Sequence, residues 1–195
     1  GKVVLGDRRL GKRLLTIARD FYAFPQANIP QSCSSRAKTK AAYRFFEHPD
    51  TEMEKILQPH YVSTERRMVK EAVILAVQDT TTLNYNTHSS TKDLGPIGAQ
   101  KEGAIGLVMH DTMAFNSEGT PLGLVDVQCW ARDYESFGKK VDSRQIPIEK
   151  KESYKWLKSF EKLTGIQKRY PQALLVSVCD READIYEFIQ RALAD

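Results

Sequence analysis

The sequence predicts an α/β protein in which a helical unit of residues 1–70 precedes a mixed sheet with flanking helices in residues 71–195. Apolar side chains recur at helical spacing through the first part, whereas apolar runs of strand length begin near residue 71. The chain has 195 residues, of which 41% are hydrophobic, so it is long enough to bury the core of one domain or of one and a half.

The helical unit begins with a helix whose apolar positions recur from Leu10 to Phe21. Asp7 precedes them in the position of an N-terminal cap. Pro25 and Pro30 then bracket a stretch without helical spacing, which predicts irregular structure there.

Two further helices are expected in this unit. The second covers about residues 34–47 and begins at one of two serines. Thr51 followed by Glu54 forms a capping-box pattern for the third helix, which continues to about residue 69 with Pro59 as a point of interruption.

The second part opens with three strands. Residues 72–77 form a continuous apolar run, which predicts a strand covered on both faces. Two longer runs at 105–115 and 122–130 are separated by the turn residues 116–119, a pattern typical of a hairpin. An antiparallel meander is therefore expected after the first strand.

A helix, a strand and a closing helix complete the predicted order. The helix is amphipathic over residues 151–169, the strand is a buried-type run over 174–179, and the closing helix covers 183–193. If the first helix is a crossover, the strand at 174–179 returns parallel to the one at 72–77.

Charge divides unevenly between the two parts. Residues 1–70 hold 14 Lys and Arg against 7 Asp and Glu, and residues 71–195 hold 15 against 18. A basic segment attracts phosphate backbones, while a carboxylate site for a divalent metal makes its surroundings negative. A solvated charged surface explains either half alone equally well.

Several classes of protein are excluded by the composition. The chain lacks an apolar run of the roughly 20 residues that span a bilayer, and its start has no signal-peptide pattern, so we expect a cytoplasmic protein without a membrane partner. The three cysteines and four histidines show no zinc-ligand spacing.

The residues that carry candidate chemistry are two aspartates at the ends of apolar strands. Asp79 follows the first run and Asp180 follows the run at 174–179. Parallel neighbouring strands lie about 4.8 Å apart, so both carboxylates would face one spot and would favour Mg²⁺ or Mn²⁺ as a shared ligand. The alternative is that each aspartate only caps the turn or helix after its strand, and we treat Glu182 and Asp184 as supporting residues.

Five motifs along the chain resemble one known family. They are Leu5-Gly6-Asp7-Arg8-Arg9 with Arg13-Leu14; Ala42-Tyr43-Arg44-Phe45-Phe46; Asp79-Thr80-Thr81-Thr82-Leu83-Asn84-Tyr85; Lys151-Glu152-Ser153 with Lys155-Trp156; and Val178-Cys179-Asp180-Arg181-Glu182-Ala183-Asp184. Together they resemble the cut-and-paste transposases of the insertion-sequence-four family.

The resemblance implies a catalytic mechanism. Asp79 and Asp180 would be the first two acids of a D-D-E triad on a ribonuclease H-like fold, whose complete site binds two Mg²⁺ or Mn²⁺ ions. Residues 71–195 would be the N-terminal part of that catalytic domain. The enzyme nicks one strand at the transposon end, forms and reopens a hairpin through the 3′ hydroxyl, and joins the end to target DNA.

The resemblance also implies a DNA-binding role for residues 1–70. The family's basic positions fall on Arg9, Arg13 and Arg44, which we expect to contact phosphates or base edges of double-stranded DNA. Lys38, Lys40 and Tyr43 are weaker candidates. By the same resemblance, two full-length protomers pair across two transposon ends, on DNA of the bacterial nucleoid.

Two departures from the family pattern qualify this prediction. The third acid belongs to a later helix beyond Asp195, so the chain alone is expected to be inactive, and Leu10 replaces a basic residue that is frequent in the family. A truncated DNA-binding regulator or inhibitor of transposition is the main alternative. A host nuclease of the same fold is a third, which would cleave DNA without dependence on a transposon end.

Overall fold

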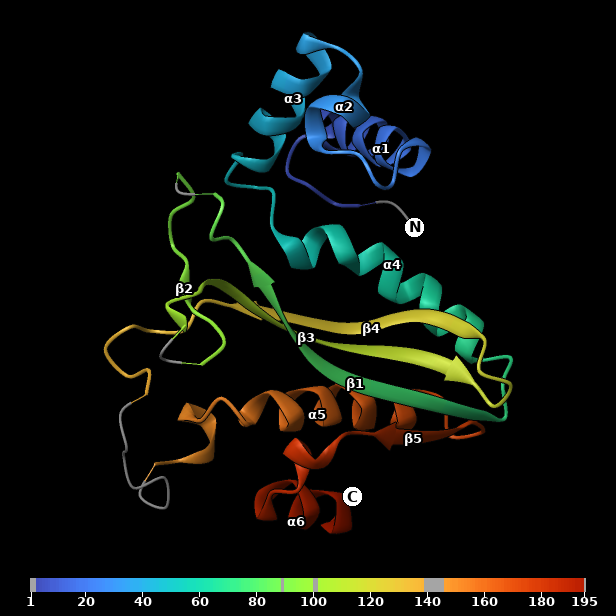
Figure 1. The fold of residues 1–195 in the computed structure, drawn as a ribbon. Helices are drawn as coiled ribbons and strands as arrows, with labels where there is room; N and C mark the ends of the chain where they lie inside the picture. Colours follow the sequence, from blue (N-terminus) through green and yellow to red (C-terminus); the bar gives the residue numbers. More distant parts are fainter. Residues whose placement is uncertain (1–2, 89, 100–101, 139–145, 195) are drawn as a thin grey trace. The chain divides into compact units, whose positions relative to one another are not determined.

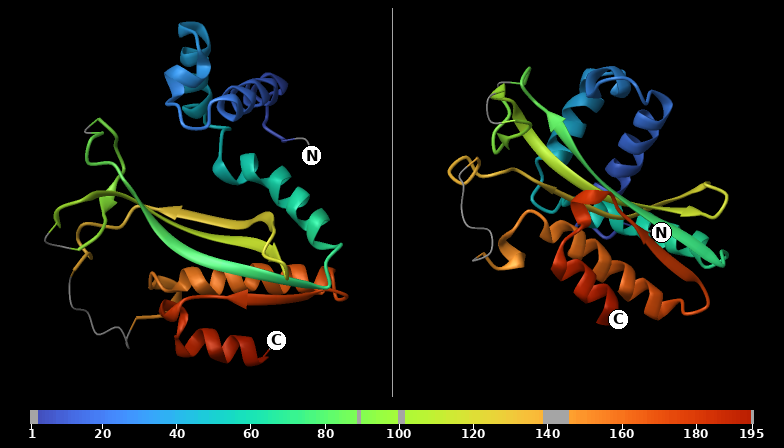
Figure 2. Two further views of the ribbon diagram at one scale, coloured as in Figure 1. Left: turned by 45° about the vertical axis from the view of Figure 1, so that its right-hand side comes forward. Right: turned by 60° about the horizontal axis from the view of Figure 1, so that its bottom comes forward.

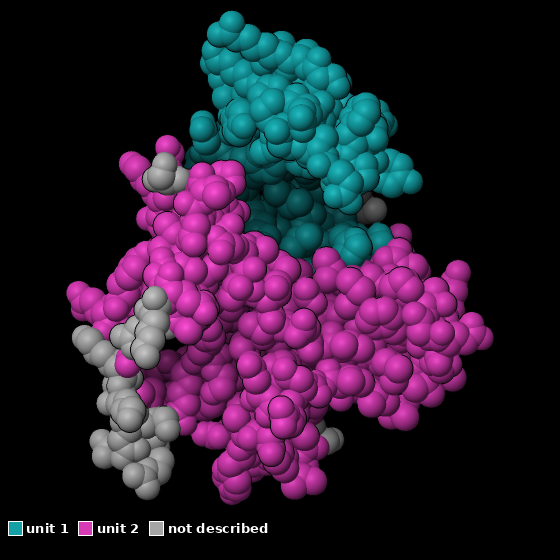
Figure 3. All heavy atoms as spheres, in the orientation of Figure 1, with its two compact units in different colours: residues 1–63 teal, residues 64–195 magenta. Residues whose placement is uncertain are grey.

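The structure is a computed structural model that describes residues 3–88, 90–99, 102–138 and 146–194. The chain divides into two compact units, residues 1–63 and 64–195, which we treat separately (Figure 3). The domain boundary expected after residue 70 stays a prediction.

The elements, in chain order, are α1 (Arg8–Ala23), α2 (Ile29–Cys33), α3 (Arg36–Phe46), α4 (Met53–Met68), β1 (Val73–Asn84), β2 (Gly95–Pro96), β3 (Ile105–Asn116), β4 (Pro121–Trp130), η3 (Ile148–Lys150), α5 (Tyr154–Arg169), β5 (Leu174–Val178), η4 (Arg181–Ala183) and α6 (Tyr186–Ala194) (Figure 1).

The first unit is helical, as the sequence predicts. Asp7 caps α1 by accepting a hydrogen bond from the backbone amide of Arg9, and Ser35 caps α3 in the same way through Lys38. The helices enclose a small apolar core. Its buried members are Leu5, Ile17, Cys33, Ala42 and Phe45.

Three details of this unit differ from the prediction. The stretch around Pro30 contains a short helix, α2, because Asn28 and Gln31 form a capping box and Pro30 is placed in the first turn, where it is tolerated. Pro59 does not interrupt α4, which runs through it. The capping box expected at Thr51 is wrong, since its hydroxyl is buried without a hydrogen-bond partner and the helix starts at Met53.

The second unit is built on a mixed sheet with strand order β2-β3-β1-β5, with β4 paired to β3. The β3–β4 hairpin turns at Asn116 to Gly119, where Gly119 has a φ of 80° and its amide donates to the Asn116 carbonyl. β1 pairs antiparallel with β3 and parallel with β5. Helices before and beside such a mixed sheet are consistent with the ribonuclease H-like arrangement that was expected.

Helix α5 covers one face of the sheet and is the crossover between β1–β4 and β5 (Figure 2). Leu163 and Ile166 of α5 pack in one core with Ile74, Ala76 and Ala114 of the sheet. α6 lies along α5 through the edge-to-face contact of Phe160 with Phe188, whose centroids are 5.2 Å apart. The parallel return of β5 depends on this crossover.

Two strand predictions need correction. β1 extends to Asn84, so Asp79 lies inside the strand and not at its end; β-branched Thr80, Thr81 and Thr82 favour extended structure and continue the pairing with β3. The strand β5 is not buried on both faces: Leu174 and Val178 are exposed because alternate side chains point away from the face that packs on α5, whereas Leu175 packs against the core.

The helices of the described residues are all too short or too polar to cross a membrane.

Candidate nucleic-acid interface and carboxylate edge

A basic groove of about 540 Å³ lies between α1 and α3 in the first unit. Arg9 and Arg13 are one helical turn apart on α1, and Lys40 and Arg44 are one turn apart on α3, so each pair lies on one face of its helix. The lining residues are Asp7, Arg9, Leu10, Arg13, Ala37, Lys40, Ala41, Arg44, Phe45 and His48.

Within the described part of the chain, Arg13, Lys40 and Arg44 have no ion-pair partner. Arg9, in contrast, binds Asp7 at 2.6 Å, an exposed pair in which the hydrogen bond from Arg9 lowers the pKa of Asp7. Three unpaired cations around one concave surface attract an anion, and a phosphate backbone is the anion that several cations can hold together.

The structure brings together four of the six predicted DNA-binding residues: Arg9, Arg13, Lys40 and Arg44. It does not bring Lys38 or Tyr43 to the groove lining. The ammonium of Lys38 binds Asp20 at 2.8 Å, and the Tyr43 ring is exposed outside the groove. His48 lines the groove and was not predicted, since a single histidine after a helix gives no sequence signal.

In the second unit, Asp79 and Asp180 occupy related positions on neighbouring parallel strands. Val77 pairs with Val178, and each aspartate follows its valine by two residues. Asp79 is within β1, whereas Asp180 lies just after β5, where its carboxylate accepts a hydrogen bond of 2.8 Å from the Glu182 amide and caps the η4 turn. We call the part of the sheet around these two aspartates, where β5 ends beside β1, the carboxylate edge.

A third carboxylate at this edge was missed by the sequence analysis. Asp111 of β3 is the direct cross-strand partner of Asp79. Partial burial, and then the neighbouring charge of Asp79, raise the pKa of the Asp111 carboxyl above its ordinary value. Only the register between β1 and β3 reveals this pairing.

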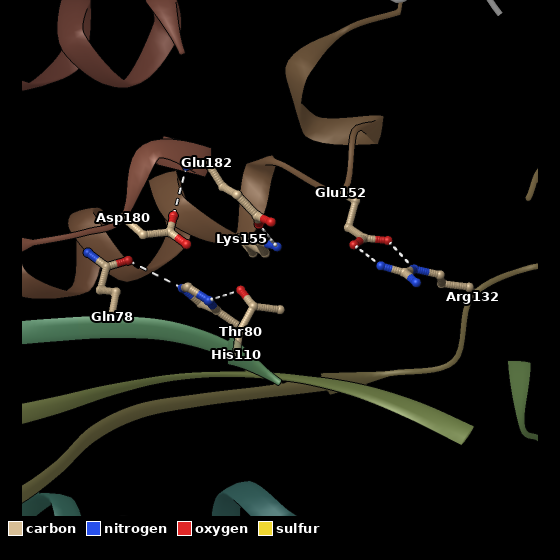
Figure 4. A network of polar contacts seen from close by, with 8 residues as sticks. All are labelled: Gln78, Thr80, His110, Arg132, Glu152, Lys155, Asp180 and Glu182. Atoms are coloured by element: carbon tan, nitrogen blue, oxygen red, sulfur yellow. Dashed lines mark hydrogen bonds and ion pairs between the residues drawn. The ribbon is translucent and has the colours of Figure 1, made fainter. Parts of the chain in front are cut away.

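Gln78 and Thr80 flank Asp79 in β1, and their side chains point to the other face of the strand, where they belong to a buried polar network. Gln78 donates from its amide nitrogen to the Ser177 hydroxyl at 2.9 Å, so its oxygen is left to accept from Nε2 of His110 at 3.3 Å. Nδ1 of His110 then accepts from the Thr80 hydroxyl at 2.9 Å (Figure 4). This pattern requires a neutral imidazole.

The electrostatics of His110 agree with that pattern. Burial, and then the positive charge of Lys155, lower the pKa of His110 to about 4. Its ring is fully buried and meets Trp156 edge to face at a centroid distance of 4.5 Å. The network joins the middle of β1 to β3 and β5, next to the residues of the carboxylate edge, and His110 packs it on Trp156 of α5.

The donor chemistry of the carboxylate edge suits a hard divalent cation, because aspartate oxygens are preferred ligands of Mg²⁺ and Mn²⁺. Yet within residues 3–88, 90–99, 102–138 and 146–194, no group of three or more His, Cys, Asp and Glu side chains is arranged to hold a metal ion. The aspartates are ligands of the right chemical type for such a cation, but too few of them are grouped to form a complete ligand set.

The helical fold of the first unit and its groove define a basic domain suited to a polyanion. Comparison with known families makes the class more specific: residues 1–51 match the family model described as Transposase DNA-binding. The matched segment contains α1, α2 and α3 and every residue that lines the groove. This match supports a transposase-type DNA-binding role for the first unit, with DNA as its partner.

Proposed function

We propose that the chain is part of a cut-and-paste DNA transposase of the insertion-sequence-four type. In this proposal the groove between α1 and α3 holds double-stranded DNA at the transposon end. The observation that carries it is that Arg9, Arg13, Lys40 and Arg44 line one groove inside the segment that matches transposase DNA-binding domains. Two protomers, each on one end, would work on DNA in the bacterial nucleoid.

The carboxylate edge would carry the chemistry. Asp79 and Asp180 would be the first two acids of a D-D-E set and would hold Mg²⁺ or Mn²⁺. When bound, the ions would activate a water or a 3′ hydroxyl and stabilise the oxygen that leaves the phosphodiester. The Gln78–His110–Thr80 network would position β1, and so Asp79, beneath this site.

Each cleavage or strand-transfer step is a substitution at phosphorus and needs no oxidant or reductant. The oxygen of water or of a 3′ hydroxyl forms a bond to phosphorus, the bond from phosphorus to the departing 3′ oxygen breaks, and the proton lost by the nucleophile ends on the departing oxygen. Cleavage followed by transfer to target DNA repeats this exchange with a new nucleophile.

A DNA-binding regulator without catalysis is the second candidate. The observation that favours it is the count of ligands: the described residues include no arrangement of three metal-binding side chains. In this case the first unit would occupy transposon ends and block the active enzyme.

Thermal unfolding with and without manganese distinguishes the two candidates. We expect manganese at about 5 mM to raise the unfolding midpoint of the chain, and the Asp79→Ala/Asp180→Ala double variant to lose that rise. Glu118→Gln, in the exposed β3–β4 turn, is the matched control and should keep it. If the unfolding midpoint with manganese equals the midpoint without it in the parent, in the double variant and in the control, the catalytic proposal fails for this chain and the regulator stands.

A further inference from the structure

A second basic cavity, of about 680 Å³, lies in the second unit between the end of β4 and the start of α5. Five basic and three acidic side chains line it, together with aromatic ones. The basic residues are Arg132, Lys150, Lys151, Lys155 and Lys158, and the acidic residues are Asp133, Glu149 and Glu152. Neither the family match, which ends at residue 51, nor the carboxylate edge accounts for this cavity.

The central cation of the cavity is Lys155. Its side chain is only 6% exposed, and its ammonium lies 5.4 Å above the Trp156 ring. Its ion pair with Glu182 spans 3.4 Å, and the Glu182 side chain is 66% exposed, so water screens that pair. A buried ammonium whose ion-pair partner is solvated retains the capacity to bind a further anion.

One acid that lines the cavity, Glu152, is already neutralised. Glu152 receives two hydrogen bonds from the Arg132 guanidinium, at 2.7 and 2.6 Å, in a forked pair that also holds the pKa of Glu152 below its ordinary value. Lys151 pairs with Glu187 at 3.6 Å. Lys155 and Lys158 are three residues apart on α5, so they present their charges on the same face of the helix.

A short chain of contacts links the cavity to the carboxylate edge. Lys155 contacts the side chain of Glu182, and the amide of Glu182 donates to Asp180 (Figure 4). The Lys155 charge also acts on His110, which is hydrogen bonded to Gln78 and Thr80 on either side of Asp79 in β1.

We propose that this cavity binds the phosphate groups of a DNA strand, with Lys155 and Lys158 as the principal contacts. The strand would pass beside Asp180, so the cavity would guide the backbone that the carboxylate edge acts on. The inference rests on the proposed function only for that last step, because phosphate binding at Lys155 is measurable by itself.

The two tryptophans of the chain give a local signal for this site. Trp130 lines the cavity, Trp156 lies under the Lys155 ammonium, and the first unit contains no tryptophan. We would titrate the full chain with an oligothymidylate of about eight nucleotides and follow tryptophan fluorescence, because a single strand of that length suits one such groove. Inorganic phosphate at the same concentration of phosphate groups is the second probe.

We expect the oligonucleotide to change the fluorescence, Lys155→Met to weaken its binding about tenfold or more, and Lys158→Gln to weaken it about threefold. The matched control is Lys168→Met, an exposed lysine of α5 outside the cavity, which should bind as the parent does. If Lys155→Met fails to fold by circular dichroism, the exposed Lys158 provides the test.

Three results would overturn the proposal: no fluorescence change with the oligonucleotide, equal binding by the parent and the cavity variants, or an equal response to inorganic phosphate, which would indicate a single-phosphate site. Binding of a labelled duplex, measured by anisotropy, separates this failure from that of the proposed function. An Arg13→Ala/Arg44→Ala variant should lose duplex binding and keep the oligonucleotide signal. The reverse result would refute the groove and leave the cavity in place.

Discussion

Asp79 of β1 lies directly opposite Asp111 of β3 in the antiparallel register. Two carboxylates that face each other across a strand pair repel, and the pKa of Asp111 is raised first by its burial and then by the charge of Asp79. The native sheet therefore carries a local electrostatic cost at the position where the candidate catalytic aspartate lies. A bound cation would relieve this repulsion.

Replacing Asp111 should stabilise the fold at neutral pH. A folded-state pKa above the ordinary one means that stability is fully present at low pH and is lost as pH rises through the folded-state value. Asp111→Asn removes this loss, so we expect its free energy of unfolding in urea to rise by about 0.5–1 kcal/mol at about pH 7 and to match the parent near pH 3. A variant that is less stable at neutral pH would show that Asp111 makes a favourable contact instead.

His110 should give the opposite dependence on pH. Its folded-state pKa, about 4, lies below the ordinary 6.5, so its contribution is complete above about pH 6.5 and is lost as pH falls toward 4. This shift corresponds to a contribution of roughly 3–4 kcal/mol at most to the free energy of unfolding. We expect His110→Gln to be less stable than the parent at neutral pH and to lose much of the decline in stability between about pH 6.5 and 4. An unchanged decline would assign it to other groups.

Much of the fold could be predicted because its signals are local. The Asp7 cap, the Ser35 cap and the turn at Asn116 to Gly119 each depend on a few neighbouring residues, and all three appear in the structure. The parallel return of β5 also followed from a general rule about crossovers.

The parts that could not be predicted depend on pairing between distant segments. Asp111 faces Asp79 only because β1 continues past Asp79 and pairs with β3 as far as Asn84. The exposure of Val178 depends on which face of β5 is covered by α5, and the cavity around Lys155 depends on how β4 and α5 approach each other. The family resemblance pointed to Arg9, Arg13 and Arg44 and, more weakly, to Lys40 and Lys38; it carried no information on the ion pair with Asp20 that Lys38 makes outside the groove lining.

Lys38 and Lys40 therefore make an informative pair, because the sequence treats them alike and the structure does not. Lys40 lines the groove, whereas Lys38 binds Asp20 outside it. Lys40→Gln should lower the slope of log affinity against log salt for duplex DNA by roughly one, and Lys38→Gln should leave the slope unchanged. Titrations by anisotropy at several salt concentrations provide the slopes, and equal slopes for the two variants would contradict the groove.

The most direct test of DNA binding by the first unit compares two double variants of equal charge on a labelled duplex of about 20 base pairs. Arg13→Ala/Arg44→Ala removes two groove cations, and Lys12→Ala/Arg19→Ala removes two exposed cations of α1 outside the groove. We predict that the groove variant weakens binding about tenfold or more and the control less than about threefold. Equal weakening by both variants would contradict the account, because net charge and not the groove would then determine binding.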